Sequence, residues 1–128
     1  MKATELRIGN LITSEENLTF EVKGIGSEGV NKNGCCNVIL FGKPDINIFI
    51  DNDFSKLKGI ELSEEWLTKF GFEKVFYIKD MQCKIENDIL ICGYVDSEYG
   101  MDEVTNIQFV HQLQNLYFAL TGTELELK

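Results

Sequence analysis

The sequence has 128 residues, of which 44% are hydrophobic, and it contains a single proline. This composition predicts one compact domain over residues 1–128, because no proline- or serine-rich linker divides the chain. The protein is acidic, and its net charge of −9 repels nucleic-acid phosphates over most of the surface, so a nucleic-acid partner is not expected. No segment resembles a signal peptide or approaches the roughly 18 apolar residues of a membrane span. We therefore expect a cytoplasmic protein that does not enter the membrane.

The first fifty residues carry the alternating apolar and polar pattern of half-buried β-strands. The first of these strands is interrupted at Gly9 and Asn10. Lys32–Gly34 predicts a hairpin loop, and the residues around Pro44, from 42 to 45, predict a turn. The expected strands cover residues 6–13, 18–23, 36–40 and 46–50. This spacing predicts a small curled antiparallel sheet or an SH3-like barrel.

Residues 63–70 predict a short helix that covers the sheet. Ser63 is placed to cap the helix, and the two glutamates that follow it favour the positive end of the helix dipole. Gly71 should end the helix in a Schellman motif that includes Phe72. Its buried face is expected to consist of Trp66, Leu67 and Phe70.

A hairpin over residues 81–94 has the best-defined register. If Asn87 and Asp88 form a two-residue turn, Cys83 lies opposite Cys92 at a non-hydrogen-bonded pair, and both thiols stay reduced in the cytosol. One apolar face then holds Met81, Cys83, Ile85, Leu90, Cys92 and Tyr94. Further strands are expected at 75–78 and 104–109, with a loop over 96–103.

Residues 104–123 form a run without a charged side chain. From Val110 the apolar residues recur at helical spacing, and Gly122 is placed to end the helix. We favour a strand to about Phe109 and a helix near 110–121. A helix that begins with a capping box at Thr105 and Gln108 is the alternative. The fold class is therefore α+β, mainly antiparallel β, with two short helices.

The second side of the expected C-terminal helix is polar but uncharged, and its stripe consists of His111, Gln114 and Phe118. Such a face can be buried under the protein's own chain or under another subunit, and the sequence leaves both possibilities open. We expect an interface at these three residues, either between copies in a homo-oligomer, most simply a two-fold dimer, or with an unknown protein partner.

Three stretches together carry a family resemblance: ELRIGN near the start, LSEEWLTKFGF in the middle and VHQLQNLYFALTG near the end. They resemble a family of small uncharacterised proteins from gut-bacterial genomes and their phages. The resemblance implies a cytoplasmic, phage-borne or mobile-element protein. It implies no activity for any residue.

The sequence lacks the patterns of common catalytic and metal sites. The four cysteines form no Cys-x-x-Cys pair, and His111 is the single histidine. Lys56 and Leu62 stand where a calcium loop starting at Asp51 would need glycine and glutamate. We therefore expect no catalytic, cofactor or metal site and favour a non-catalytic interaction module. The alternatives are a nucleic-acid-related protein, through local contact or as an acidic DNA mimic, and a small thiol enzyme.

Overall fold

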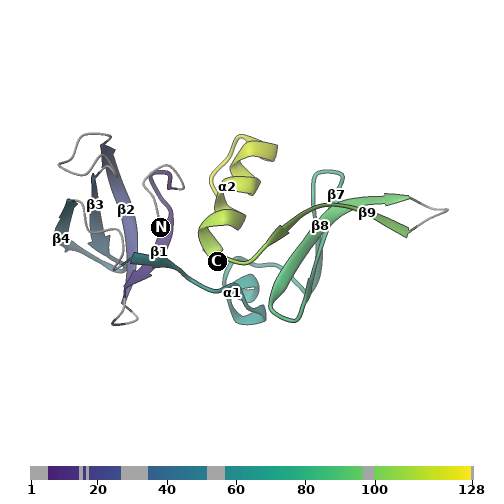
Figure 1. Cartoon of the computed structure of the whole chain (residues 1–128), viewed down its shortest axis with the longest axis horizontal. Coiled ribbons are helices and arrows are strands. Elements are labelled where there is room, and N and C mark those ends of the chain that lie inside the picture. Colours follow the sequence, from purple (N-terminus) through teal and green to yellow (C-terminus); the bar gives the residue numbers. More distant parts are fainter. Residues whose placement is uncertain are drawn as a thin grey trace. The chain divides into compact units, whose positions relative to one another are not determined.

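The computed structural model describes residues 6–14, 16, 18–26, 35–51, 57–96 and 100–127 (Figure 1). These residues form the predicted α+β fold, which is mainly antiparallel β with two helices. The chain divides into two compact units, Met1–Ile60 and Glu61–Lys128. A compact unit of this size can be part of a larger domain or a domain by itself. The single domain over residues 1–128 therefore stays a prediction.

The first unit is a five-stranded antiparallel sheet with the order β4-β3-β2-β1-β5. Its first four strands form a meander, and the fifth returns beside β1. A bulge between Val22 and Gly24 adds twist to β2. This arrangement agrees with the predicted small curled sheet, and within the described residues β4 and β5 are not paired. The strands are β1 (Leu11–Ser14), β2 (Thr19–Gly26), β3 (Cys35–Leu40), β4 (Lys43–Asp51) and β5 (Leu57–Gly59).

One face of this sheet forms the core of the first unit. Phe20 of β2 lies between Ile12 of β1 and Leu40 of β3, so apolar side chains continue across the strands. The alternation of period two therefore sorts these side chains onto the buried face, as the sequence predicts. The buried cluster consists of Leu6, Ile12, Phe20, Val22, Val38 and Leu57.

Two details of the first unit differ from the prediction. The turn between β3 and β4 lies at Phe41 and Gly42, where Gly42 has φ +81°, and Pro44 is already part of β4. Proline is tolerated there because β4 is an edge strand. The short strand β5 was not expected. The predicted hairpin loop at Lys32–Gly34 lies outside the described residues.

The second unit contains a four-stranded antiparallel sheet with the order β6-β7-β8-β9 and both helices. Asn87 and Asp88 have φ values of 52° and 63°, as a type I′ turn requires. The predicted register is confirmed from Glu86 opposite Ile89 back to Gln82 opposite Gly93. The elements are α1 (Glu64–Lys69), β6 (Val75–Ile78), β7 (Met81–Glu86), β8 (Ile89–Asp96), β9 (Gly100–Ile107) and α2 (Val110–Thr121).

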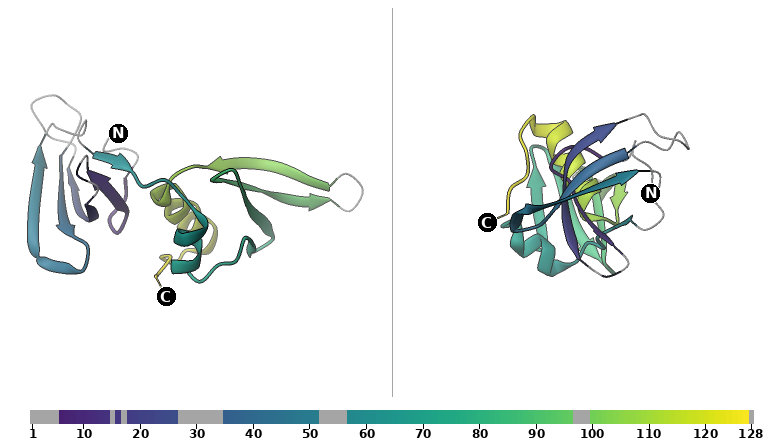
Figure 2. Two further views of the ribbon diagram at one scale, coloured as in Figure 1. Left: turned by 90° about the horizontal axis from the view of Figure 1, so that it is seen from below. Right: turned by 90° about the vertical axis from the view of Figure 1, so that its left-hand side faces the viewer.

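The expected loop over residues 96–103 is wrong, because β8 continues to Asp96 and β9 begins at Gly100. Beyond Gly93, β8 pairs only with β9, and the two strands continue as an arm (Figure 2). Tyr94 lies on this arm and is 48% exposed, so its assignment to the apolar face was also wrong. A bulge between Cys92 and Gly93 shifts the pairing with β9 just before Tyr94.

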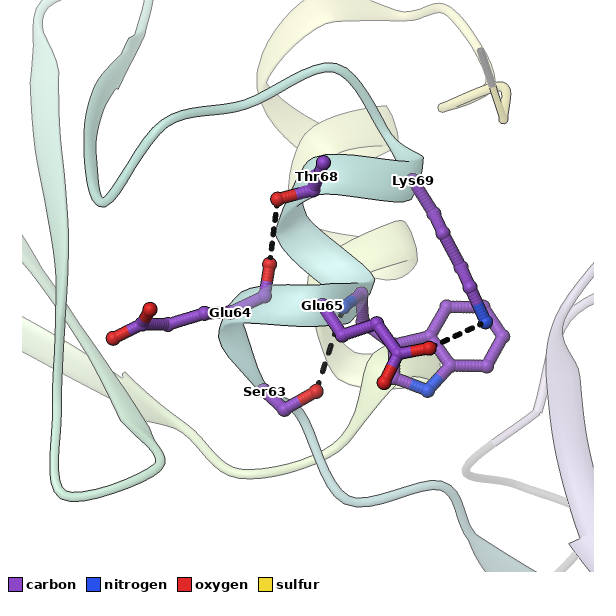
Figure 3. A network of polar contacts seen from close by, with 6 residues as sticks. Ser63, Glu64, Glu65, Thr68 and Lys69 are labelled. Carbon is purple, nitrogen blue, oxygen red and sulfur yellow. Dashed lines mark hydrogen bonds and ion pairs between the residues drawn. The ribbon is translucent and has the colours of Figure 1, made fainter.

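The α1 helix has the predicted ends. The Ser63 hydroxyl accepts a hydrogen bond from the backbone N–H of Trp66 at 3.4 Å. At the other end the N–H of Gly71 donates to Thr68 O at 2.9 Å and the N–H of Phe72 to Leu67 O at 2.8 Å, which together make a Schellman motif. Figure 3 shows two further contacts of this helix. The Thr68 hydroxyl donates a hydrogen bond to the backbone oxygen of Glu64, and Nζ of Lys69 forms an ion pair with the Glu65 carboxylate.

Trp66 is not the core residue that the sequence predicts. Leu67 and Phe70 are buried, whereas Trp66 is half-buried. Its ring lies 6.1 Å from that of Phe70, and Nζ of Lys69 lies 4.4 Å from the centre of the Trp66 ring. A six-residue helix has a narrow buried stripe, so Trp66 at its margin keeps one edge near solvent and contacts a cation there.

Candidate functional site

The C-terminal helix α2 begins where the favoured interpretation of the sequence placed it. β9 ends at Ile107, and Phe109 forms an isolated antiparallel bridge with Glu61 before the first helical residue, Val110. The Gln112 side-chain oxygen accepts hydrogen bonds from the N–H groups of Gln108 at 3.0 Å and Phe109 at 3.1 Å. The capping residue is therefore Gln112, which reaches back to the residues before the helix, and the alternative start at Thr105 is wrong.

The inner stripe of α2 attaches the helix to its own unit. Val110 and Leu113 are fully buried, and the helix packs against β6 and β9. The Tyr117 ring lies 6.3 Å from that of Phe72, which in turn stacks on Phe76 of β6 at 4.1 Å with an angle of 6° between the rings. This series of aromatic rings fixes the rotation of α2 about its axis and so determines which residues can reach the outside.

The three predicted interface residues differ in exposure. His111 and Gln114 are buried, with exposed fractions of 5% and 4%, whereas Phe118 is 39% exposed. The imidazole of His111 stacks on the Phe109 ring at a centroid distance of 5.8 Å. Helical spacing in the sequence placed these residues on one stripe. It could not show that other residues of the protein bury the stripe at His111 and Gln114 but leave Phe118 exposed. Phe118 is therefore the exposed member of the stripe.

The C-terminal end of α2 holds Phe118 in place. The N–H of Gly122, at φ +73°, donates to Phe118 O at 2.8 Å, and the Thr121 hydroxyl donates to Tyr117 O at 2.8 Å. Ala119, which is not one of the predicted interface residues, is exposed beside Phe118. The exposed end of α2 thus presents a phenyl ring and a methyl group on a helix without any charged side chain.

A second chemical feature of this unit is a buried pair of thiols. Cys83 of β7 and Cys92 of β8 are direct cross-strand partners, and both are buried free thiols. A side-chain hydrogen bond to Cys92, together with burial, raises the pKa of Cys83 far above its usual range. The same hydrogen bond from Cys83 lowers the pKa of Cys92, against the opposing effect of burial.

Two surface depressions lie in the second unit. One, of about 360 Å³, is lined by residues of and after α1, including Leu67, Phe72 and Lys74. The other, of about 210 Å³, lies beside the start of α2 and is lined by Glu61, Asp88, Ile89, Gln108 and Phe109. The first is also lined by the polar side chains of Glu64, Thr68 and Glu73. Among the described residues, no three His, Cys, Asp or Glu side chains come together as a metal site.

Comparisons with protein-family models, with curated proteins and with solved structures find no match for this chain. Within the part of the chain that the structure describes, no helix is long and apolar enough to cross a membrane.

Proposed function

We propose that the protein is a non-catalytic interaction module that forms a two-fold dimer through the exposed end of α2, around Phe118. In this proposal the protein works in the cytoplasm. The resemblance of its three sequence stretches to proteins of gut bacteria and their phages supports an accessory role in a phage or another mobile element.

The observation that carries the proposal is the combination of exposure and missing charge on α2. Phe118 is 39% exposed, Ala119 is exposed beside it, and no residue of the helix is charged. The outer side of a solvent-facing helix normally carries Lys and Glu. Depletion of charge with an aromatic residue at the centre is the composition found in the middle of protein interfaces.

Charge also favours a second copy of the chain as the partner. Two molecules that each carry a net charge of −9 repel one another wherever their carboxylates face each other. This repulsion is smallest at an uncharged helix, so α2 is a suitable place for two copies to meet. A basic partner would gain more by binding to the acidic surface. The small side chain of Ala119 would let two such helices approach closely.

The length of α2 sets the expected affinity. A helix of twelve residues is about 18 Å long, and its exposed end covers less area than a standard interface needs on each partner. We therefore expect a dissociation constant in the micromolar range rather than the nanomolar range.

Sedimentation velocity of the wild type between about 1 and 100 μM tests the proposal, because dimers of this affinity form within that range. The variant Phe118→Glu should remain a folded monomer, since a carboxylate pressed against its symmetry mate loses its hydration. Circular dichroism of the variant checks that it is folded.

Phe41→Glu is the matched control. Phe41 is 44% exposed in the turn between β3 and β4, so this variant adds the same charge at a similar exposure in the other unit. It should dimerise like the wild type. A wild type that is monomeric throughout the range would refute the proposed dimer. Equal dissociation of both variants would place the contact elsewhere than on α2.

A further inference from the structure

The register of the sheet places Cys83 and Cys92 at a separation that suits a disulfide. The two residues are direct partners in the register of β7 and β8. Counting back from the two-residue turn at Asn87 and Asp88 makes them a non-hydrogen-bonded pair. At such pairs the Cα atoms are about 4.5 Å apart, which lies within the range that disulfides span. A bond between the two sulfurs therefore needs no rearrangement of the sheet.

The same two side chains are shielded from solvent. Cys83 and Cys92 both have an exposed fraction of 0%. They lie in the two central strands of the sheet, with Phe76 of β6 beside Cys83 and Thr105 of β9 beside Cys92. A small disulfide or thiol cannot reach either sulfur while these strands remain paired. Exchange at this site therefore requires the unit to open.

We propose that Cys83 and Cys92 form a dithiol–disulfide site whose oxidation state is fixed while the second unit folds and is then preserved by the fold. In the folded protein the burial of both sulfurs blocks oxidation as well as reduction. It keeps small-molecule disulfides away from the reduced pair and thiol reductants away from the oxidised pair. The redox partner of the site is thus a small disulfide or thiol that is present when the chain folds.

The exchange reaction in the open chain is balanced. Cys92 loses its proton to the solvent, and its thiolate attacks one sulfur of a small disulfide such as oxidised glutathione, whose other half leaves as a thiolate and takes up a proton from the solvent. The thiol of Cys83 then loses its proton and attacks the Cys92 sulfur, which releases the second glutathione as a thiol. Two protein thiols are oxidised, and one small disulfide is reduced to two thiols.

A refolding experiment with exchanged redox buffers tests the proposal. Cys35 and Cys36 are first replaced by serine so that they do not take part in exchange. The protein is unfolded in urea and refolded in one case with reduced glutathione and in the other with oxidised glutathione, and the two folded samples are then moved to the opposite buffer. Acid quenching, alkylation and mass spectrometry measure the fraction of protein with the Cys83–Cys92 bond over time.

We expect each folded sample to keep the state in which it folded, with conversion at least about 100-fold slower than in urea. Glu86→Cys, which adds an exposed thiol on the same strand, is the control for reagent activity, and this thiol should react rapidly in the folded protein. If the serine background does not fold, peptide mapping of the wild type follows the same bond.

Two results would overturn the proposal. Conversion of the folded samples at the rate of the Glu86→Cys thiol would show that the fold does not shield the pair. Refolding with oxidised glutathione that never joins Cys83 to Cys92 would show that the pair cannot form a disulfide.

Discussion

At the scale of single residues, Asn10 has a structural role that its position in the sequence does not reveal. The residue is buried, its side-chain oxygen accepts a hydrogen bond from the N–H of Arg7 at 2.6 Å, and its backbone oxygen accepts one from the N–H of Val22 at 2.9 Å. The sequence marked Gly9 and Asn10 only as an interruption of a strand. The interruption is a turn, in which Gly9 has φ +97° and the Asn10 amide satisfies the freed backbone.

Asn10→Ala should therefore lower the free energy of unfolding by about 1–3 kcal/mol, because the part-buried N–H of Arg7 loses this acceptor. Urea unfolding followed by circular dichroism measures the change. Asn37→Ala is the control, since Asn37 is exposed on β3 and its loss should cost less than about 0.5 kcal/mol. Equal effects of the two substitutions would contradict the role assigned to the Asn10 amide.

Substitutions at Trp66 and Phe70 test whether the size of a side chain or its burial determines how much stability is lost. Phe70→Ala should cost about 3–5 kcal/mol because it opens a cavity at a fully packed position. Trp66→Ala should cost only about 1–2 kcal/mol, because the larger ring is half-buried and its contact with Lys69 is near solvent. The same urea titration compares the two variants. A greater loss for Trp66→Ala would restore the sequence-based view of Trp66 as a core residue.

At the scale of elements, the parts predicted well are those in which a local rule fixes the geometry. The turn at Asn87 and Asp88 determined the register of β7 and β8, because two residues in a type I′ turn leave one way to pair the strands. The apolar spacing from Val110 and the glycine at position 122 likewise determined the extent of α2. Neither prediction needed information from distant residues.

The parts that the sequence missed depend on neighbours in space. The arm of β8 and β9 contains Gly100 and several acidic residues, which have low strand propensity and indicate a loop, yet backbone pairing extends both strands. Tyr94 is exposed where β8 has passed its last pair with β7 and only β9 continues beside it. At the candidate site, helical spacing placed His111, Gln114 and Phe118 on one stripe. The exposure of each residue depends on which other parts of the fold pack over it, and the spacing of the stripe does not contain that information.

The connection between β6 and β7 offers a test at this scale. Ile78 pairs with Met81, so Lys79 and Asp80 form a two-residue connection, and Lys79 has φ +53°. An L-residue with a side chain is strained in this region, whereas glycine is not. Lys79→Gly should therefore raise the free energy of unfolding by about 0.5–1 kcal/mol.

Asp80→Gly is the control for the same connection. Asp80 is not among the described residues with positive φ, so glycine there only adds freedom to the unfolded chain and should cost about 0.5–1 kcal/mol. Thermal or urea unfolding measures both variants. A loss of stability in both would mean that Lys79 does not adopt the left-handed conformation in solution.

At the scale of the whole molecule, the acidic composition and the uncharged helix together predict how self-association depends on ionic strength. The net charge of −9 keeps copies of the protein apart in dilute salt, while the contact proposed on α2 contains no ion pair that salt could weaken. Long-range repulsion and short-range attraction therefore respond differently to ionic strength. This difference separates a dimer built on α2 from a contact between oppositely charged surfaces.

We predict that dimerisation becomes several-fold tighter as salt rises from about 0.01 M to about 0.15 M, because the Debye length falls from about 30 Å to about 8 Å and screens the repulsion between copies. Sedimentation equilibrium at several salt concentrations measures the dissociation constant. Phe118→Glu should stay monomeric at every salt concentration in this range, which distinguishes a specific contact from salting out. A dimer that weakens as salt is added would instead have to be held by opposite charges, and α2 could not be its interface.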